Sequence, residues 1–173
     1  MLLKKKWLPL ILAGIMIGVF TGLSYGAPEG VQKVRPAKEF SLKDLSSKKV
    51  SLSDFRGKVI LLNFFTTWCP PCRIEIPELV KIYQQNKNKG LVVLGVSLDK
   101  DVVPFMLKNF AKEMKISYPV LIGTEEVADS YQITGVPATF VISKEGKAYK
   151  RFDGLVPTDH LEKALKDLLE TKS

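Results

Sequence analysis

The sequence has few of the residues that usually build metal sites. Its 173 residues include only two cysteines, Cys69 and Cys72, and a single histidine, His160. A structural zinc site takes about four ligands, and His160 lies far along the chain on a segment with helical spacing. We therefore expect no bound metal and no cofactor.

The chain also lacks a basic stripe interleaved with aromatic residues, an internal repeat and a low-complexity tract. Its net charge is +8, from 26 Lys and Arg against 18 Asp and Glu. Nucleic-acid-binding proteins gather basic residues on one face or element. We therefore predict no nucleic-acid partner and interpret the excess charge as a lysine-rich solvated surface.

The N-terminus has the pattern of an export signal. Residues 4–6 are lysines, and residues 7–23 form an uncharged apolar run. Ser24 and Gly26 then supply the small residues that precede a cleavage site before Ala27. Because the run also reaches the lower limit for spanning a bilayer, residues 1–26 are predicted to be a signal peptide or an N-terminal membrane anchor. Both alternatives place the rest of the chain outside the cytoplasm, in the periplasm or at the outer face of the cell membrane, where disulfides persist.

Apolar patterning divides the remainder into a linker at 27–36 and one domain at 37–173. Buried strands alternate with helices, which predicts an α/β fold with a mixed sheet and helices on both faces. Pro77 is expected to kink its helix rather than end it. Strands are predicted at 38–45, 49–55, 58–65, 90–99, 118–123, 138–143 and 147–154, and helices at 74–87, 102–115, 125–133 and 157–170.

Both cysteines lie in the stretch FFTTWCPPCRIEIP, residues 64–77, where a buried strand ends and the next helix begins. The free N–H groups and the dipole at a helix start stabilise a negative sulfur. A thiol pKa lowered in this way makes Cys69 the attacking thiolate. Cys72 lies one turn further along and is predicted to be more buried, so it resolves the mixed disulfide.

Three other interpretations of the cysteine pair are less favoured. A structural disulfide across so short a loop would constrain the unfolded chain little. A zinc site lacks ligands. A plain buried pair gives no reason for Trp68 and two prolines to flank it.

The stretches NFFTTWCPPCRIEIPEL (63–79) and TGVPATFVISKEGK (134–147), with the Asp-Gly pair that ends at Gly154, resemble the thioredoxin superfamily. They resemble more closely the exported, membrane-associated thiol–disulfide oxidoreductases of the TlpA/ResA type. The resemblance covers residues 37–173. It implies a thioredoxin-like fold, a mixed central sheet flanked by helices, with an N-terminal β-hairpin extension.

The resemblance also implies roles for three residues around the cysteines. Pro137 is expected to be a cis proline that faces the disulfide. It would leave the backbone of Val136 free to hold an extended substrate segment by main-chain hydrogen bonds. Trp68 is expected to be exposed as a platform for partner proteins, with packing as the alternative.

Glu75 matches an acidic residue that this subfamily carries three positions after the second cysteine. At that spacing it shares a helix face with Cys72, and a partly buried carboxyl could pass a proton between thiols. The alternative is an ordinary first-turn glutamate stabilised by the helix dipole. Asn63 stands where ordinary thioredoxins carry a buried aspartate, and an amide cannot titrate.

The leading hypothesis is therefore a monomeric disulfide reductase that acts on exported proteins. The resemblance suggests apocytochrome c as a target, in a cytochrome c maturation-type role, with a membrane thiol carrier as electron donor. A thiol peroxidase is an alternative because Thr66 precedes Cys69 as in peroxiredoxins, although Leu62 replaces the upstream proline expected there. A non-enzymatic haem or metal chaperone is the other alternative.

Overall fold

The computed structural model describes residues 35–100 and 103–170. The segment expected to be a signal peptide or anchor, and the linker up to residue 34, lie outside these residues. Within the described ranges, no helix is both long and apolar enough to cross a bilayer.

One mixed sheet forms the centre of the domain, with strand order β1-β8-β7-β4-β5-β6-β2-β3. Strands β4, β5 and β6 are parallel to one another, and the remaining pairs are antiparallel. The predicted mixed sheet is thus confirmed. The strands are β1 (Arg35–Pro36), β2 (Ser41–Asp44), β3 (Lys49–Ser51), β4 (Val59–Phe65), β5 (Leu91–Ser97), β6 (Val120–Ile122), β7 (Ala138–Ile142) and β8 (Lys147–Asp153).

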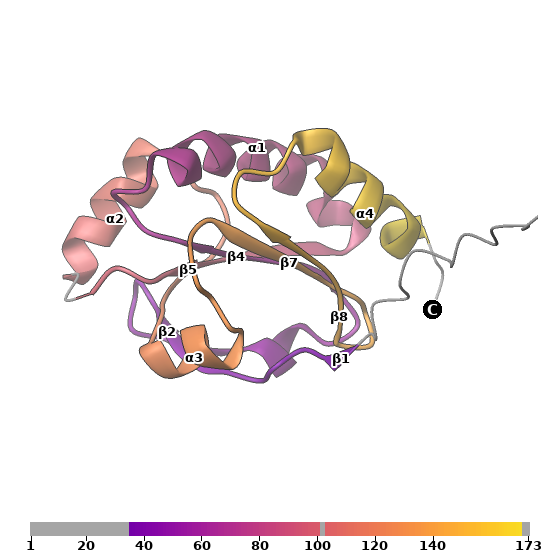
Figure 1. Ribbon diagram of the computed structural model, residues 1–173, viewed down its shortest axis with the longest axis horizontal. Coiled ribbons are helices and arrows are strands. Elements are labelled where there is room, and N and C mark those ends of the chain that lie inside the picture. Colours follow the sequence, from indigo (N-terminus) through magenta and orange to yellow (C-terminus); the bar gives the residue numbers. More distant parts are fainter. Residues whose placement is uncertain (1–34, 101–102, 171–173) are drawn as a thin grey trace, which may run out of the picture. The chain divides into compact units, whose positions relative to one another are not determined.

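Helices cover both faces of the sheet, as predicted. In Figure 1, α1 and α4 run along one side of the central strands with α2 beside them, and α3 lies on the other side next to β2. The α-helices are α1 (Pro70–Asn86), α2 (Pro104–Glu113), α3 (Glu125–Ser130) and α4 (Thr158–Glu170), and two short 3-10 helices occupy Leu52–Phe55 and Lys87–Lys89.

Strand β4 is the middle of the core, since all seven of its residues are buried. Its side chains alternate between the two faces. Leu62 and Phe64 pack with the α3 side of the sheet, whereas Leu61 packs with Leu79 of α1 and Leu161 of α4. The continuous apolar run at 58–65 therefore correctly predicted a strand that is covered on both faces.

Helix α1 continues through Pro77, and its buried residues include Cys72, Glu75, Ile76 and Leu79. These positions follow the spacing of a single helix face. The face carries Glu75 into the interior together with its apolar neighbours.

Several boundaries differ from the predicted ones. The predicted strand 49–55 ends at Ser51 and continues as a 3-10 helix. The last two residues of the predicted linker, Arg35 and Pro36, pair with β8. The helix predicted at 125–133 ends at Ser130, because Gln132 adopts a left-handed φ of 53° that a helix cannot continue through.

Gly123 joins β6 to α3 at a point with no room for a side chain. A Cβ there would lie 2.5 Å from the Ser97 carbonyl oxygen and 2.8 Å from Leu98 Cδ2. We expect Gly123→Ala to lower the free energy of unfolding by about 2 kcal/mol, because the backbone must shift. Urea denaturation measures the change.

Gly135→Ala is the matched control, since a Cβ at Gly135 meets nothing within 4 Å. It should change the free energy of unfolding by less than about 0.5 kcal/mol or raise it slightly. Equal losses in the two variants would contradict the packing around Gly123.

Candidate active site

The two cysteines form a disulfide at the start of α1, with their Cα atoms 5.3 Å apart. Cys69 is the N-cap residue, and Pro70 and Pro71 occupy the first two helical positions. Proline is tolerated there because these N–H groups have no partner within a helix. Cys69 is 3% exposed and Cys72 is 1% exposed, so the difference in burial has the predicted direction but is small.

Within residues 35–100 and 103–170, the Cys69 sulfur has one hydrogen-bond donor and one carbonyl oxygen close to it. The Cys72 N–H donates to Cys69 Sγ at 3.2 Å, and the Val136 carbonyl oxygen lies 3.6 Å from the same sulfur. The prolines remove two further N–H groups that a helix start normally offers. The surroundings therefore stabilise a thiolate less than an ordinary helix N-terminus would.

The peptide bond between Val136 and Pro137 is cis, as the resemblance implied. The Gly154 N–H donates to the Pro137 carbonyl oxygen at 2.8 Å, which ties this loop to the end of β8. Pairing of β7 with β4 begins at Ala138, so the backbone of Val136 lies outside that ladder. Val136 and Pro137 thus lie beside the disulfide.

Glu75 is buried beneath the active-site helix, with 1% of its surface exposed. Asn63 Nδ2 on β4 donates to Glu75 Oε2 at 2.7 Å and to Thr139 Oγ1 on β7 at 2.9 Å. The Thr139 hydroxyl lies 3.4 Å from the same carboxyl oxygen. The alternative, an ordinary first-turn glutamate stabilised by the helix dipole, does not fit this burial, and the first turn of α1 contains no acidic residue.

Burial raises the pKa of Glu75 from 4.5 to about 7, against the lowering effects of the Val156 backbone amide, Asn63 and Thr139. Glu75 Oε1, Asn63 Oδ1 and Tyr118 Oη are buried and have no hydrogen-bond partner in the part of the chain that the structure describes. Buried polar groups are usually paired, so these three atoms are exceptions. A carboxyl with this pKa can hold or release a proton near neutral pH.

Asn63 positions the Glu75 carboxyl, a role that sequence reasoning missed. The sequence showed only that Asn63 cannot titrate. In the structure its amide holds Glu75, whose position is 12 residues away in the chain. The signal that could have found this contact is the register of β4, which turns the Asn63 side chain towards α1.

A second group that sequence reasoning missed holds the residues just before Cys69. The Thr67 N–H donates to both carboxylate oxygens of Asp99, at 3.1 and 3.0 Å, and the Thr67 hydroxyl donates to Asp99 Oδ1 at 2.8 Å. The Ser97 hydroxyl donates to Asp99 Oδ2 at 2.6 Å. Asp99 follows β5, so the carboxyl ends of two parallel strands are joined here.

Arg73 also holds Thr67, through the Thr67 carbonyl oxygen. Its Nη1 donates to the Thr67 carbonyl oxygen at 3.1 Å, and its guanidinium pairs with Glu113 and lies 5.2 Å from the centre of the Phe110 ring. The charge of Arg73 is thus engaged with neighbours, and Thr67 is fixed at both its N–H and its carbonyl. Trp68 follows and is 73% exposed.

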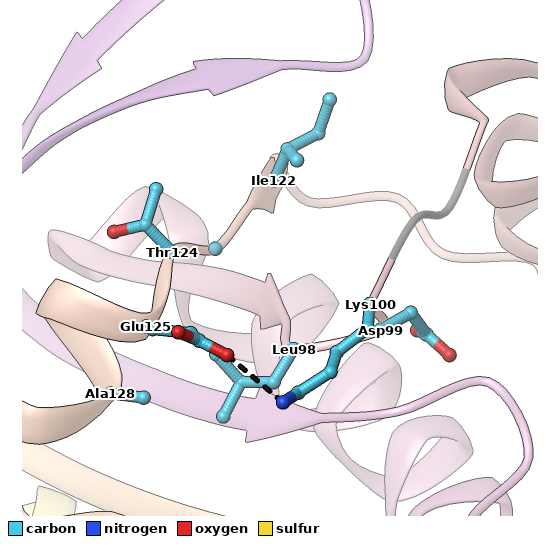
Figure 2. Close-up of a pocket in the computed structure, with 8 residues that line it drawn as sticks. Leu98, Asp99, Lys100, Ile122, Thr124, Glu125 and Ala128 are labelled. Carbon is cyan, nitrogen blue, oxygen red and sulfur yellow. Dashed lines mark ion pairs between the residues drawn. The ribbon is translucent and has the colours of Figure 1, made fainter.

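Figure 2 shows a hollow at the carboxyl ends of β5 and β6, beside α3. Its volume is about 590 Å³, and the ion pair between Lys100 and Glu125, at 2.9 Å, crosses it. Asp99 lies at its edge, with a carboxylate that points away from this ion pair. Neither cysteine nor Glu75 lines this hollow, so it is separate from the disulfide.

Thr66, on which the peroxidase alternative depends, has a buried hydroxyl without a hydrogen-bond partner among residues 35–100 and 103–170. It therefore does not bond to the Cys69 sulfur. The same residues contain no cluster of three or more His, Cys, Asp or Glu side chains that could hold a metal ion.

Comparison with known proteins agrees with this geometry. Residues 34–150 match the AhpC/TSA family model. The chain belongs to the AhpC/TSA family. It is 34% identical over 169 residues to the thiol-disulfide oxidoreductase ResA of Bacillus cereus, with 96% of each chain covered, and 32% identical over 160 residues to ResA of Bacillus subtilis, with 88% covered.

A solved thiol:disulfide interchange protein of the thioredoxin family, from Chlorobium tepidum TLS, superposes with a TM-score of 0.71 at 30% identity. That comparison covers 81% of this chain and 99% of the other. The predicted resemblance and the thioredoxin-like fold are confirmed. This chain is a thiol–disulfide oxidoreductase, and its reaction partners are thiols and disulfides.

The raised pKa of Glu75 predicts a pH-dependent stability. The carboxyl is neutral in both states below about pH 4.5, and between about pH 4.5 and 7 the folded state holds a proton that the unfolded state has lost. The free energy of unfolding should therefore fall across this range, by about 3 kcal/mol in total. In Glu75→Gln this fall should disappear, as measured by denaturation of the oxidised protein from pH 4.5 to 8.

Glu78→Gln serves as the control, because Glu78 is partly exposed on the same helix and pairs with Lys81. It should keep the pH dependence of the wild type. A Glu75→Gln profile parallel to the wild-type profile would show that Glu75 is not the group that titrates.

Proposed function

We propose that this thiol–disulfide oxidoreductase acts outside the cytoplasm and reduces disulfides in exported proteins. The observation that carries the proposal is the set of groups around the Cys69 sulfur. Among the described residues one N–H, that of Cys72, donates to it, and the Val136 carbonyl oxygen faces it. The buried carboxyl of Glu75 lies one turn beyond Cys72.

These groups favour a reductant over an oxidant. A strongly oxidising site stabilises its reduced, thiolate form. Here Pro70 and Pro71 contribute no N–H, and a negative charge on Glu75 would oppose a thiolate on Cys72, which shares its helix face. The reduced dithiol is therefore less stabilised than it would be at a helix N-terminus without these prolines. A less stable reduced form lowers the reduction potential.

In the proposed reaction, the Cys69 thiolate attacks a substrate disulfide and forms a mixed disulfide, and one substrate thiolate leaves and takes up a proton. The Cys72 thiol then loses its proton to Glu75 and attacks the Cys69 sulfur, which releases the second substrate thiolate. Glu75 returns the proton to that thiolate. The substrate gains two electrons and two protons, and Cys69 and Cys72 become the disulfide found in the structure.

The location and partners are inferred from the N-terminal sequence and the resemblance. The apolar run at 7–23 supports export, with residues 1–26 either removed or kept as an anchor. Trp68 and the Val136 backbone would contact the substrate, with Pro137 shaping the loop. The proposed target is an exported cysteine protein such as apocytochrome c, and a membrane thiol carrier would reduce Cys69–Cys72 again.

Trapping of mixed disulfides tests the roles of the two cysteines. Reduced Cys72→Ala keeps the attacking thiol but cannot resolve, so it should accumulate mixed disulfides with a cystine-containing protein. Reduced Cys69→Ala should accumulate roughly tenfold less, because Cys69 is the N-cap residue whose sulfur accepts the Cys72 N–H, whereas Cys72 lies within the helix. Non-reducing gel electrophoresis after acid quenching, with the double variant as control, measures the trapped fraction.

Equal trapping by the two single variants would remove the assignment of Cys69 as nucleophile. Trapping by neither would contradict the proposed reaction.

A further inference from the structure

Exposed apolar side chains gather near the beginnings of α1 and α2. Seven large apolar side chains are exposed among the described residues, and five of them come from these two segments: Trp68, Ile74, Val103, Phe105 and Met106. Single exposed apolar residues are ordinary on protein surfaces, whereas a group of them marks a contact site.

Two members of this group line a shallow hollow beside the disulfide. The hollow has a volume of about 330 Å³, which is at the small end of the roughly 300–1,000 Å³ of ligand pockets. We call it the Trp68–Met106 hollow, and its lining includes Trp68, Arg73, Met106, Asn109, Phe110 and Glu113.

The hollow lies close to the reaction centre. Phe110 packs in the same core cluster as Cys69 and Cys72, and Trp68 directly precedes Cys69. Any polypeptide that forms a mixed disulfide must place its own sulfur on Cys69. Because a chain advances about 3.3–3.6 Å per residue, the neighbours of its cysteine must lie over the surface around Cys69.

The charges in the hollow are already paired with each other. Arg73 is the only cation and Glu113 the only anion among the residues that line it, and the two form an ion pair. The Arg73 guanidinium also stacks on Phe110 and donates to Thr67. A charged partner residue would therefore gain no free counter-charge, whereas Trp68 and Met106 offer apolar surface that adapts to an apolar side chain.

We propose that the Trp68–Met106 hollow receives an uncharged, apolar or aromatic side chain that lies within three residues of the reacting cysteine of a polypeptide substrate. This inference rests on the proposed function and adds a sequence preference to it. It makes Met106 a specificity-determining residue, remote from the sulfurs themselves.

The test uses reduced full-length protein and a set of peptides, each carrying one cysteine as a mixed disulfide with glutathione. Phe is placed in turn at each position within three residues of that cysteine, in an otherwise Ser-rich peptide, and the second-order rate constant is measured by stopped flow. The best Phe peptide should react about tenfold faster than the all-Ser peptide. A peptide with Glu at the same position should be no faster than the all-Ser peptide.

Met106→Ser should lower the ratio of the Phe and Ser rates to about threefold or less, because it removes apolar surface from the hollow. Met106 is 61% exposed, so the fold should tolerate this change. Tyr149→Ser is the matched control and should leave the ratio at about tenfold. Tyr149 is exposed on β8. Through β7, its part of β8 is aligned with the amino end of β4, whereas Cys69 follows the carboxyl end of β4.

A Phe-to-Ser ratio near one in the wild type, with both peptides reacting, would overturn this inference and leave the proposed reaction intact. A tenfold ratio that Met106→Ser does not change would overturn it as well, since the preference would then arise elsewhere. Failure of every peptide to react would overturn the proposed reaction, and the inference with it.

Discussion

The buried carboxyl of Glu75 joins the active-site helix to β4 and β7, two neighbouring strands of the sheet. Through Asn63 on β4 and Thr139 on β7, it is held where the apolar interior would otherwise exclude a charge. A lone buried carboxylate is costly, so the group stays protonated up to about pH 7. Burial of Glu75 lowers the stability of the folded state when the carboxyl is ionised. The same burial brings its pKa to about 7, which suits a proton carrier near the disulfide.

The other constraint is the fixed position of the loop that carries Trp68 and Cys69. Thr67 is held at its N–H and hydroxyl by Asp99 and at its carbonyl by Arg73. Cys69 then begins the helix with two prolines after it, and the Val136 carbonyl oxygen lies 3.6 Å from its sulfur. A rigid loop of this kind presents the disulfide in one orientation while Trp68 stays exposed for a partner.

Much of this arrangement follows from the sequence, and the rest depends on contacts between distant positions. The buried strand at 58–65, a helix after it and the redox pair at their junction were predicted from apolar patterning and cysteine spacing, although the helix begins at Pro70 and not at the predicted residue 74. The cis peptide came from the family resemblance, because the pattern around Pro137 alone indicates only a turn. The partners of Glu75 and Thr67 were not predicted, since 64 residues separate Glu75 from Thr139 and 32 separate Thr67 from Asp99.

The central claim is that the groups around Cys69 make the dithiol a reductant. The reduction potential of the Cys69–Cys72 couple, measured at pH 7 by equilibration with thiol–disulfide buffers, tests it most directly. The account predicts a potential of about −250 mV or lower, in the range of reducing thioredoxins. A potential near about −120 mV, that of a strong oxidant, would contradict it.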